Sequence, residues 1–342
     1  MIALLVVLAI GFAYSMGAHY TGACMGMPHA LRAVSARNAL LVMAPLTLAG
    51  AALASHGVEH TVGHDLLTGA GLSVAGLVIV IAVAFGLTSL FNVARVPTST
   101  IQILVFSVAG TGLAAGTGVH WATIGTLVAI WAAAPVVAGL LGYALTRVLD
   151  LVPAIRAQAQ VTGAALAGVT AGGSPAGSGL LAAGLIAVGA LASFTMGGND
   201  VANATGSLVG AGTFSPLAAG LIGGAGLAAG VLTWGRPLLR KVAFDIVTVD
   251  RPMATAAQLV QAAVVLAAVG SGFFTSMNQA LIGAMTGAAA ARGRRTVRAG
   301  ALRGVLRGWL IGPGAAIVLG YAISWLVAVT AGAHTLLAAG RR

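Results

Sequence analysis

Long apolar segments separated by short polar connections constrain the fold of this chain more than any other feature. A helix needs about 20 mainly apolar residues to cross a bilayer, and several segments here reach that length. Only 7% of the residues are charged, against about 25% in soluble domains. The segments lack the polar–apolar alternation of strands in a membrane barrel. We therefore predict an all-α polytopic membrane protein whose apolar segments are 1–34, 37–54, 69–91, 98–116, 119–146, 180–212, 215–233, 256–272, 275–290 and 309–331.

The basic residues indicate how these segments are oriented. Most of the 17 Lys and Arg residues lie in connections that fall on one side if the chain crosses ten times. The loop 55–68, on the other side, contains no Lys or Arg. Because cytoplasmic loops carry the excess of basic residues, the pattern predicts a plasma-membrane protein with both termini outside. This distribution accounts for the net charge of +11 without a nucleic-acid partner, and residues 236–251 are predicted to form an amphipathic piece at the interface.

One ten-residue stretch, Gly197–Gly206, places polar side chains in an otherwise apolar segment. Its ionisable residue is Asp200, which stands between Asn199 and Asn203. An aspartate at the centre of a membrane helix costs roughly 2.5–3.5 kcal/mol on insertion scales, so it is by default a functional residue. We predict that Asp200 holds a coupling cation or proton, or accepts a hydrogen bond from a P–OH group.

The two halves of the chain repeat a pattern. A shift of 180 aligns 16–26 with 196–206, and a shift of 177 aligns 98–102 with 275–279. Five crossings per half is an odd number, so the second copy is predicted to be inverted relative to the first. Inverted repeats with Gly-rich polar breaks are typical of secondary transporters. The predicted organisation is a first repeat at 1–146, a linker at 147–179 and a second repeat at 180–342.

The polar breaks are predicted to form one anion site near the bilayer midplane. Broken helices present free backbone N–H groups and a positive dipole end, which suit an anion. Hydroxyl and amide side chains at the breaks can donate further hydrogen bonds. A single Ser or Thr there can instead bond back to its own helix. The predicted substrate-binding residues are His19, Tyr20, Ser99, Thr100, Gln102, Asn199, Asn203, Thr275, Ser276, Asn278 and Gln279.

At these residues the chain resembles the inorganic phosphate transporter (PiT) family. That family carries Gly-Ala-Asn-Asp-x-Ala-Asn-Ala in each half, paired with Pro-x-Ser-Thr-Thr-His. Here Gly197–Ala204 matches the first pattern closely, and Arg95–Gln102 matches the second through its Pro, Ser and Thr. The resemblance implies an inverted-repeat permease that moves a tetrahedral oxyanion, phosphate by default, coupled to Na⁺ or H⁺ and without another cofactor.

The first half departs from the family pattern. His19 and Tyr20 stand where the family has Asn and Asp, and Gln102 and Gln279 replace both histidines. One family carboxylate therefore remains, and the first half looks like the sulfate-permease branch of the family. Sulfate carries no proton at neutral pH and suits a site made only of donors, so phosphate and sulfate both stay open.

Other classes of function fit the sequence less well. His56-Gly-Val-Glu59-His60, followed by His64, fits the H-x-x-E-H pattern of a zinc protease. A zinc site needs ligands held in place by regular structure, whereas this stretch is predicted to be a solvated outer loop, with an incidental metal-binding loop as the lesser alternative. The sequence contains no catalytic triad and no P-loop, so we predict no enzyme and no resident metal. A passive anion channel is the alternative to a carrier, and a homodimer stays open.

Overall fold

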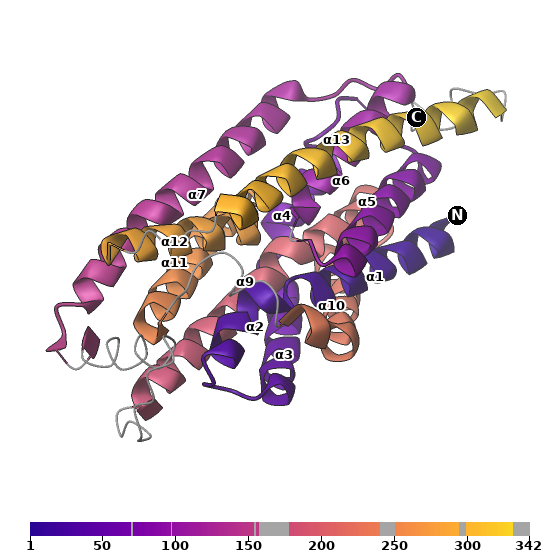
Figure 1. Ribbon diagram of the computed structural model, residues 1–342. Helices are drawn as coiled ribbons and strands as arrows, with labels where there is room; N and C mark the ends of the chain where they lie inside the picture. Colours follow the sequence, from indigo (N-terminus) through magenta and orange to yellow (C-terminus); the bar gives the residue numbers. More distant parts are fainter. Residues whose placement is uncertain are drawn as a thin grey trace.

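The computed structural model describes residues 1–69, 71–96, 98–153, 155–156, 178–239, 250–293 and 299–330. These residues form a bundle of helices with one isolated β-bridge, between Leu67 and Val119 (Figure 1). The all-helical prediction is confirmed. The helices are α1 (Ile2–His19), α2 (Thr21–Ala30), α3 (Ala36–Ala54), α4 (His56–His64), α5 (Val74–Ala94), α6 (Thr100–Ala114), α7 (Trp121–Leu149), α9 (Ser178–Gly210), α10 (Pro216–Leu239), α11 (Arg251–Gly270), α12 (Met277–Ala291) and α13 (Ala299–Thr330).

Eight helical segments are long and apolar enough to cross a membrane, when α1 and α2 are counted as the single segment Ile2–Ala30. The segments predicted at 98–116 and 275–290 are α6 and α12, and each has only 15 residues. A helix of that length measures about 22 Å, which is less than the ~30 Å of the hydrocarbon core. The prediction of ten crossings is therefore wrong for the described residues, because these two helices are too short to span alone.

The short helices α6 and α12 are the second arms of two helical hairpins. The segment before α5 lies beside the segment after α6, since Thr68 N donates to Gly118 O at 2.8 Å. An ion pair between Asp250 and Arg292 holds the start of α11 beside the end of α12. Each hairpin therefore begins and ends on one side of the molecule and reverses at a tip inside it. The first tip comprises 95–96 and 98–99, and the second comprises 271–276.

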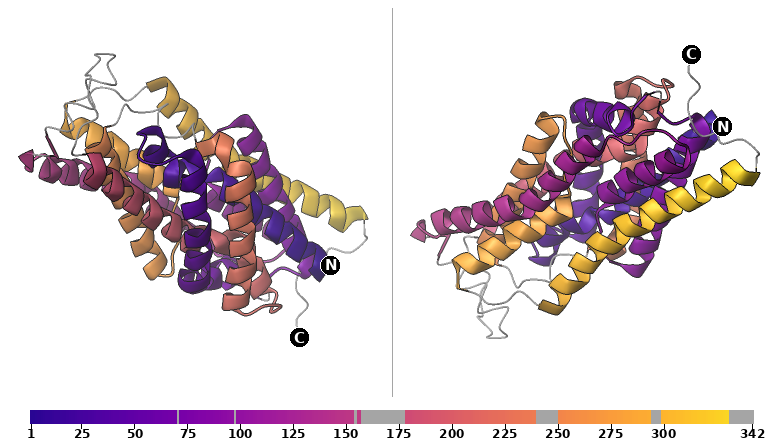
Figure 2. Two further views of the ribbon diagram at one scale, coloured as in Figure 1. Left: turned by 90° about the horizontal axis from the view of Figure 1, so that it is seen from below. Right: turned by 90° about the horizontal axis from the view of Figure 1, so that it is seen from above.

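Helices of one half pack against helices of the other in a reciprocal pattern. α1 packs on α10 and α3 on α9, while α6 packs on α13 and α12 on α7. The N-terminus and the far end of α13 lie at the same end of the bundle (Figures 1 and 2). Two copies related by a two-fold axis would pair in this way. The division at 147–179 and the inversion of the copies stay predictions, since most of that linker, like most of 236–251, lies outside the described residues.

Matched glycines allow these helices to approach closely. A Cβ on Gly17 of α1 would lie 2.0 Å from Leu227 O of α10, and a Cβ on Gly197 of α9 would lie 2.0 Å from Thr47 O of α3. Real Cβ atoms essentially never come within 3.0 Å of another heavy atom. Small residues at helix interfaces are typical of membrane proteins. Gly17 and Gly197 occupy matching positions in the two halves, so the repeat preserves the packing contact.

Of the predicted breaks, those at 98–102 and 275–279 are present, and the one at 196–206 is absent. α9 runs without interruption through Gly197–Gly206. Its polar side chains form hydrogen bonds with neighbouring segments, and its helical backbone stays intact. In the first half a single residue, Tyr20 (φ −93°, ψ 2°), separates α1 from α2. The extended breaks are the hairpin tips, where Ser99 and Ser276 cap the following helices.

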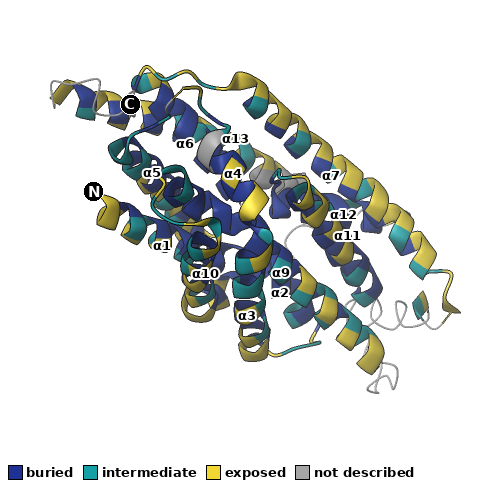
Figure 3. Ribbon diagram, turned by 180° about the vertical axis from the view of Figure 1, so that it is seen from behind, coloured by how far each residue is buried: buried dark blue, intermediate teal, exposed yellow. Residues whose placement is uncertain are grey.

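Exposed residues lie along the outer faces of the helices, and buried residues lie inside the bundle (Figure 3). Many of the exposed side chains are large and apolar, and many polar side chains are buried. Leu140, Leu310 and Val318 are 68%, 77% and 63% exposed, whereas Asn199 and Asp200 are fully buried. This distribution is the one that lipid requires, so the chain is an integral membrane protein.

Candidate functional site

The two hairpin tips meet inside the bundle. Asn278 Nδ2, in the first turn of α12, donates a hydrogen bond to Thr98 O of the first tip at 2.9 Å. Ser99 caps α6 and Ser276 caps α12, each accepting from the backbone N–H three residues later at 3.4 Å. The N-termini of two buried 15-residue helices from opposite halves therefore converge. Such N-termini carry unpaired N–H groups and partial positive charge.

Asp200 lies fully buried on α9, beside the second tip. Asn199 Nδ2 donates to its Oδ2 at 3.2 Å, and Asn203 Nδ2 donates to its Oδ1 at 3.5 Å. Within the described residues no Arg, Lys or His forms an ion pair with it. A buried carboxylate held only by neutral donors is able to accept a cation or a proton.

Asn199 holds the second hairpin tip in place. Its Nδ2 donates to Thr275 O at 2.9 Å, and its Oδ1 accepts from Thr275 N at 3.1 Å. Because Nδ2 also donates to Asp200, both amide hydrogens of Asn199 are used within the protein. Its predicted role as a donor to the substrate stays a prediction, and the geometry gives it a positioning role.

His19 plays the corresponding part in the first half. Its Nδ1 lies 2.5 Å from Asn92 Oδ1, while Asn92 Nδ2 donates to Ser15 O at 2.8 Å. The Asn92 oxygen therefore faces the ring, and His19 carries its hydrogen on Nδ1. Its Nε2 faces the first tip, where it lies 3.4 Å from Thr98 N, which can donate to it, and 3.2 Å from Thr98 O. The sequence analysis missed Asn92, although it is the only amide in the apolar helix α5.

Tyr20 joins the first half to the second. Its hydroxyl lies 2.9 Å from Thr100 Oγ1 of α6, and it is also near the Asp200 carboxylate. The rings of Tyr20 and His19 meet edge to face at 5.0 Å. The aromatic hydroxyl therefore stands between the first turn of α6 and the single carboxylate of the motif.

Several polar atoms of the predicted site have no partner. All eleven predicted substrate-binding residues are buried, and hydrogen bonds join residues from both halves. Five side-chain oxygens lack a hydrogen-bond partner within the described part of the chain: Gln102 Oε1, Asn203 Oδ1, Thr275 Oγ1, Asn278 Oδ1 and Gln279 Oε1. Buried polar atoms are nearly always paired, so this cluster is expected to meet a ligand. Oxygen acceptors suit a cation or a P–OH group, and the helix N-termini suit anionic oxygens.

The H-x-x-E-H stretch is a helix, so its prediction as a solvated loop is wrong. In α4 the Glu59 side chain is fully buried and Oε1 accepts from Thr205 Oγ1 at 2.8 Å. His56 is exposed, and His60 pairs with exposed Asp65 at 3.5 Å. Among the described residues no three His, Cys, Asp or Glu side chains are grouped to hold a metal ion. The His64 side chain lies outside the described part. The alternation of exposed and buried residues along α4 separates Glu59 from the histidines.

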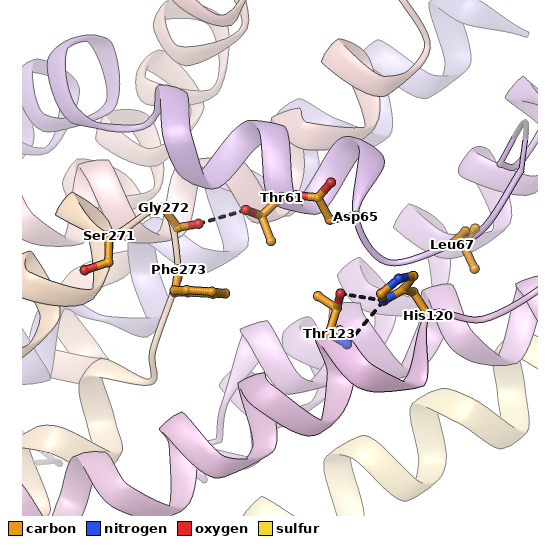
Figure 4. A pocket seen from close by; sticks show the side chains of 8 residues that line it. All are labelled: Thr61, Asp65, Leu67, His120, Thr123, Ser271, Gly272 and Phe273. Atoms are coloured by element: carbon orange, nitrogen blue, oxygen red, sulfur yellow. Dashed lines mark hydrogen bonds between the residues drawn. The ribbon is translucent and has the colours of Figure 1, made fainter.

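A cavity of about 360 Å³ lies between α4, the start of α7 and the second hairpin tip (Figure 4). Thr61 Oγ1 donates across it to Gly272 O at 2.8 Å, and His120 Nδ1 lies 2.7 Å from Thr123 Oγ1 on the opposite wall. Part of its wall is the hairpin tip that Asn199 anchors. Its lining residues are Thr61, Asp65, Leu67, His120, Thr123, Ser271, Gly272 and Phe273.

The sequence matches a family described as the phosphate transporter family over residues 16–320. It is 31% identical over 147 residues to the chloroplastic inorganic phosphate transporter 2-1 of Arabidopsis thaliana, an alignment covering 39% of this chain and 25% of that protein. It is 30% identical over 131 residues to a putative phosphate permease of Haemophilus influenzae, covering 35% of this chain and 31% of that protein. The aligned part thus spans a quarter to a third of the length of these relatives.

The fold is similar to that of a solved structure described as the sodium-dependent phosphate transporter. The TM-score is 0.84, and the match covers 96% of this chain and 98% of that chain. Sequence identity is 21%, so the likeness concerns the fold.

Proposed function

The chain belongs to the phosphate transporter family, and from this premise we propose that it is a secondary transporter of inorganic phosphate driven by Na⁺. Membership places it among transporters rather than enzymes. The solved structure with the same fold is described as sodium-dependent, and this supports Na⁺ over H⁺ as the driving ion.

One observation carries the proposal: a lone buried carboxylate lies beside two converging helix N-termini. The helix N-termini and their capping serines would bind the anionic oxygens of phosphate. Asp200 and the unpaired Asn203 Oδ1 would hold the cation, or accept a hydrogen bond from a protonated phosphate oxygen. Together these groups would balance the charges of the bound phosphate and cation in a buried site.

Phosphate is favoured over sulfate on three grounds. The curated relatives reported above are both described as phosphate carriers, and neither supports the sulfate-permease branch. The side chain that suggested a donor-only site, His19, is engaged with Asn92 and the first hairpin tip. Four unpaired amide oxygens, which can only accept, also suit an anion that carries a proton.

The reciprocal pairing of helices supports two inverted repeats that alternate access to the site. Each tip is anchored to the motif helix of its own half and touches the other tip, so the two halves share one site. A passive anion channel would share these helices, but it would need no carboxylate at the site.

Uptake of labelled phosphate into proteoliposomes tests the proposal. An inward Na⁺ gradient should drive accumulation above the external concentration, and a K⁺ gradient of equal size should not. Equilibration without accumulation would indicate a channel, and accumulation driven by pH alone would indicate H⁺ coupling. Unlabelled sulfate should compete less well than unlabelled phosphate, and the opposite order would reinstate sulfate as the substrate.

A further inference from the structure

Glu59 is a second carboxylate buried inside the bundle, and the transport mechanism above does not use it. Its side chain is 0% exposed. Oε1 accepts one hydrogen bond, from Thr205 Oγ1 at 2.8 Å, and Oε2 has no partner within the described residues. The hydroxyls of Thr205 and Ser55 also lie within hydrogen-bond distance of backbone carbonyls one turn earlier, Val201 O at 3.0 Å and Ala51 O at 2.6 Å. A buried carboxylate whose neighbours are only shared, neutral donors is costly to ionise and tends to take up a proton.

The elements packed against α4 provide no charge to balance an ionised Glu59. These elements are α9 above all, then α10 and α11. Their titratable or charged groups, with those of α4, are Asp200 on α9, Arg236 on α10, Arg251 on α11, and His56, His60 and His64 on α4. Asp200 is itself an acid. Arg236 lies near the end of α10 opposite to Gly220, which faces Ala51 and Ser55 just before α4. Arg251 begins α11, whereas Gly272, which faces Gly57 of α4, follows the other end of that helix. His56 and His60 are exposed.

α4 connects Glu59 to both parts of the anion site. Thr205, the partner of Glu59, lies on α9 five residues after Asp200, or about 7.5 Å along the helix. Two residues after Glu59, Thr61 Oγ1 donates to Gly272 O of the second tip at 2.8 Å. A change of charge at Glu59 therefore acts on α9 through Thr205. It also occurs two residues away from the Thr61 contact with the second hairpin tip.

We propose that Glu59 is a proton-binding site linked to anion binding. The proton adds to Oε2, while Oε1 keeps its hydrogen bond from Thr205; one O–H bond forms and the carboxylate becomes a neutral acid. An ionised Glu59 would repel an anion bound about 10 Å away, and across a partly buried site this weakens binding about tenfold. Proton uptake removes that repulsion. The inference rests on the proposed function only for the identity of the anion.

The site would titrate in a physiological range. Burial raises the pKa of Glu59 to about 7, and the Thr205 hydrogen bond opposes that rise. α4 lies outside the eight candidate membrane spans, and Thr61 of the same helix lines the cavity described above.

Glu59→Gln mimics the protonated state and is the main variant to test, with His56→Gln as a matched control on the same helix. Full-length protein is melted in detergent between about pH 5 and 8, without phosphate. The melting temperature of the wild type and of His56→Gln should fall as pH rises through this range. The fall that ionisation of Glu59 causes should be missing in Glu59→Gln. Thr205→Val, which removes the donor, should move the midpoint to higher pH, whereas Thr205→Ser should not.

Phosphate affinity is then measured at about pH 6 and pH 8. Taking the ratio of wild type to Glu59→Gln at each pH cancels the titration of phosphate itself. The ratio should be near one at the lower pH, and the wild type should bind about tenfold more weakly at the higher pH. Identical pH profiles for wild type and Glu59→Gln, or an unchanged midpoint in Thr205→Val, would overturn the assignment. The melting experiment contains no substrate, so failure of phosphate uptake in all variants would overturn the proposed function and leave the proton site standing.

Discussion

Gly230→Ala tests whether close helix packing holds the two halves together. A Cβ at this position of α10 would lie 1.9 Å from Tyr14 O of α1, about 1.1 Å nearer than the 3.0 Å that real Cβ atoms respect. The obstacle is a backbone carbonyl, so no side chain can swing aside and the helices must separate. Overpacking of this kind costs about 1–3 kcal/mol, and backbone contact favours the upper end.

Alanine offsets part of that cost because it favours a helix by about 1 kcal/mol over glycine. We therefore expect a net loss of about 2 kcal/mol, or about 3 °C in melting temperature for a chain of this size. Gly184→Ala in α9 is the control, since a Cβ there meets nothing within 4 Å. Gly50→Ala, at the matching position of the first half, should behave like Gly230→Ala, because its Cβ would lie 1.8 Å from Phe194 O. Melting is followed by size-exclusion chromatography after heating in detergent. If Gly230→Ala proves as stable as Gly184→Ala, the packing argument is wrong.

Three further variants test the charged groups. Asp200→Asn should abolish phosphate accumulation against a gradient while the protein still folds, and accumulation by a folded Asp200→Asn would show that the carboxylate does not couple transport. Arg292→Gln should cost about 3–5 kcal/mol, because it removes the guanidinium that pairs with both Asp150 and Asp250, and adding Asp250→Asn should restore part of the loss in a melting assay. Since the pKa of Glu59 is raised from 4.5 to about 7, the native state loses about 3 kcal/mol as pH rises from 4.5 to 7 and nothing more above that; Glu59→Gln should lack this slope in denaturant titrations at a series of pH values.

The helical class and the position of the motif could be predicted because both depend on local sequence. The length of an apolar segment determines whether it can cross a membrane. An Asp beside two Asn in such a segment has few purely structural roles. Whether a segment crosses or turns back is a tertiary property. The composition of α6 is as apolar as that of a spanning helix, and only the pairing of segments 66–68 and 118–120 shows that its hairpin returns to the side it came from.

The break expected in α9 and the loop expected at α4 failed for related reasons. Glycine and asparagine are weak helix formers, so Gly197–Gly206 indicated a break. In the structure that glycine content serves packing on α3, and Asn199 satisfies its polar groups on the second tip without opening the backbone. Glu59 is predicted to lie in a solvated loop because its stretch is a short, Gly-containing connection between two predicted crossings. The partner that buries it, Thr205, lies far away in the second half of the chain, and no local pattern identifies it.

The degenerate first half makes sense once the tips are considered. The two offsets of the repeat relate His19 to Asn199, and they relate Thr98 to Thr275, the residues that these two side chains contact. His19 and Asn199 thus perform the same task with different chemistry: each fixes the backbone of the hairpin tip of its own half. An imidazole can replace an amide there because the task needs one acceptor for a backbone N–H. In the proposed mechanism Asp200 needs a charge, which the Tyr20 hydroxyl at the matching position does not provide. The proposal therefore combines a two-fold scaffold with a single carboxylate, which is enough to balance one monovalent cation.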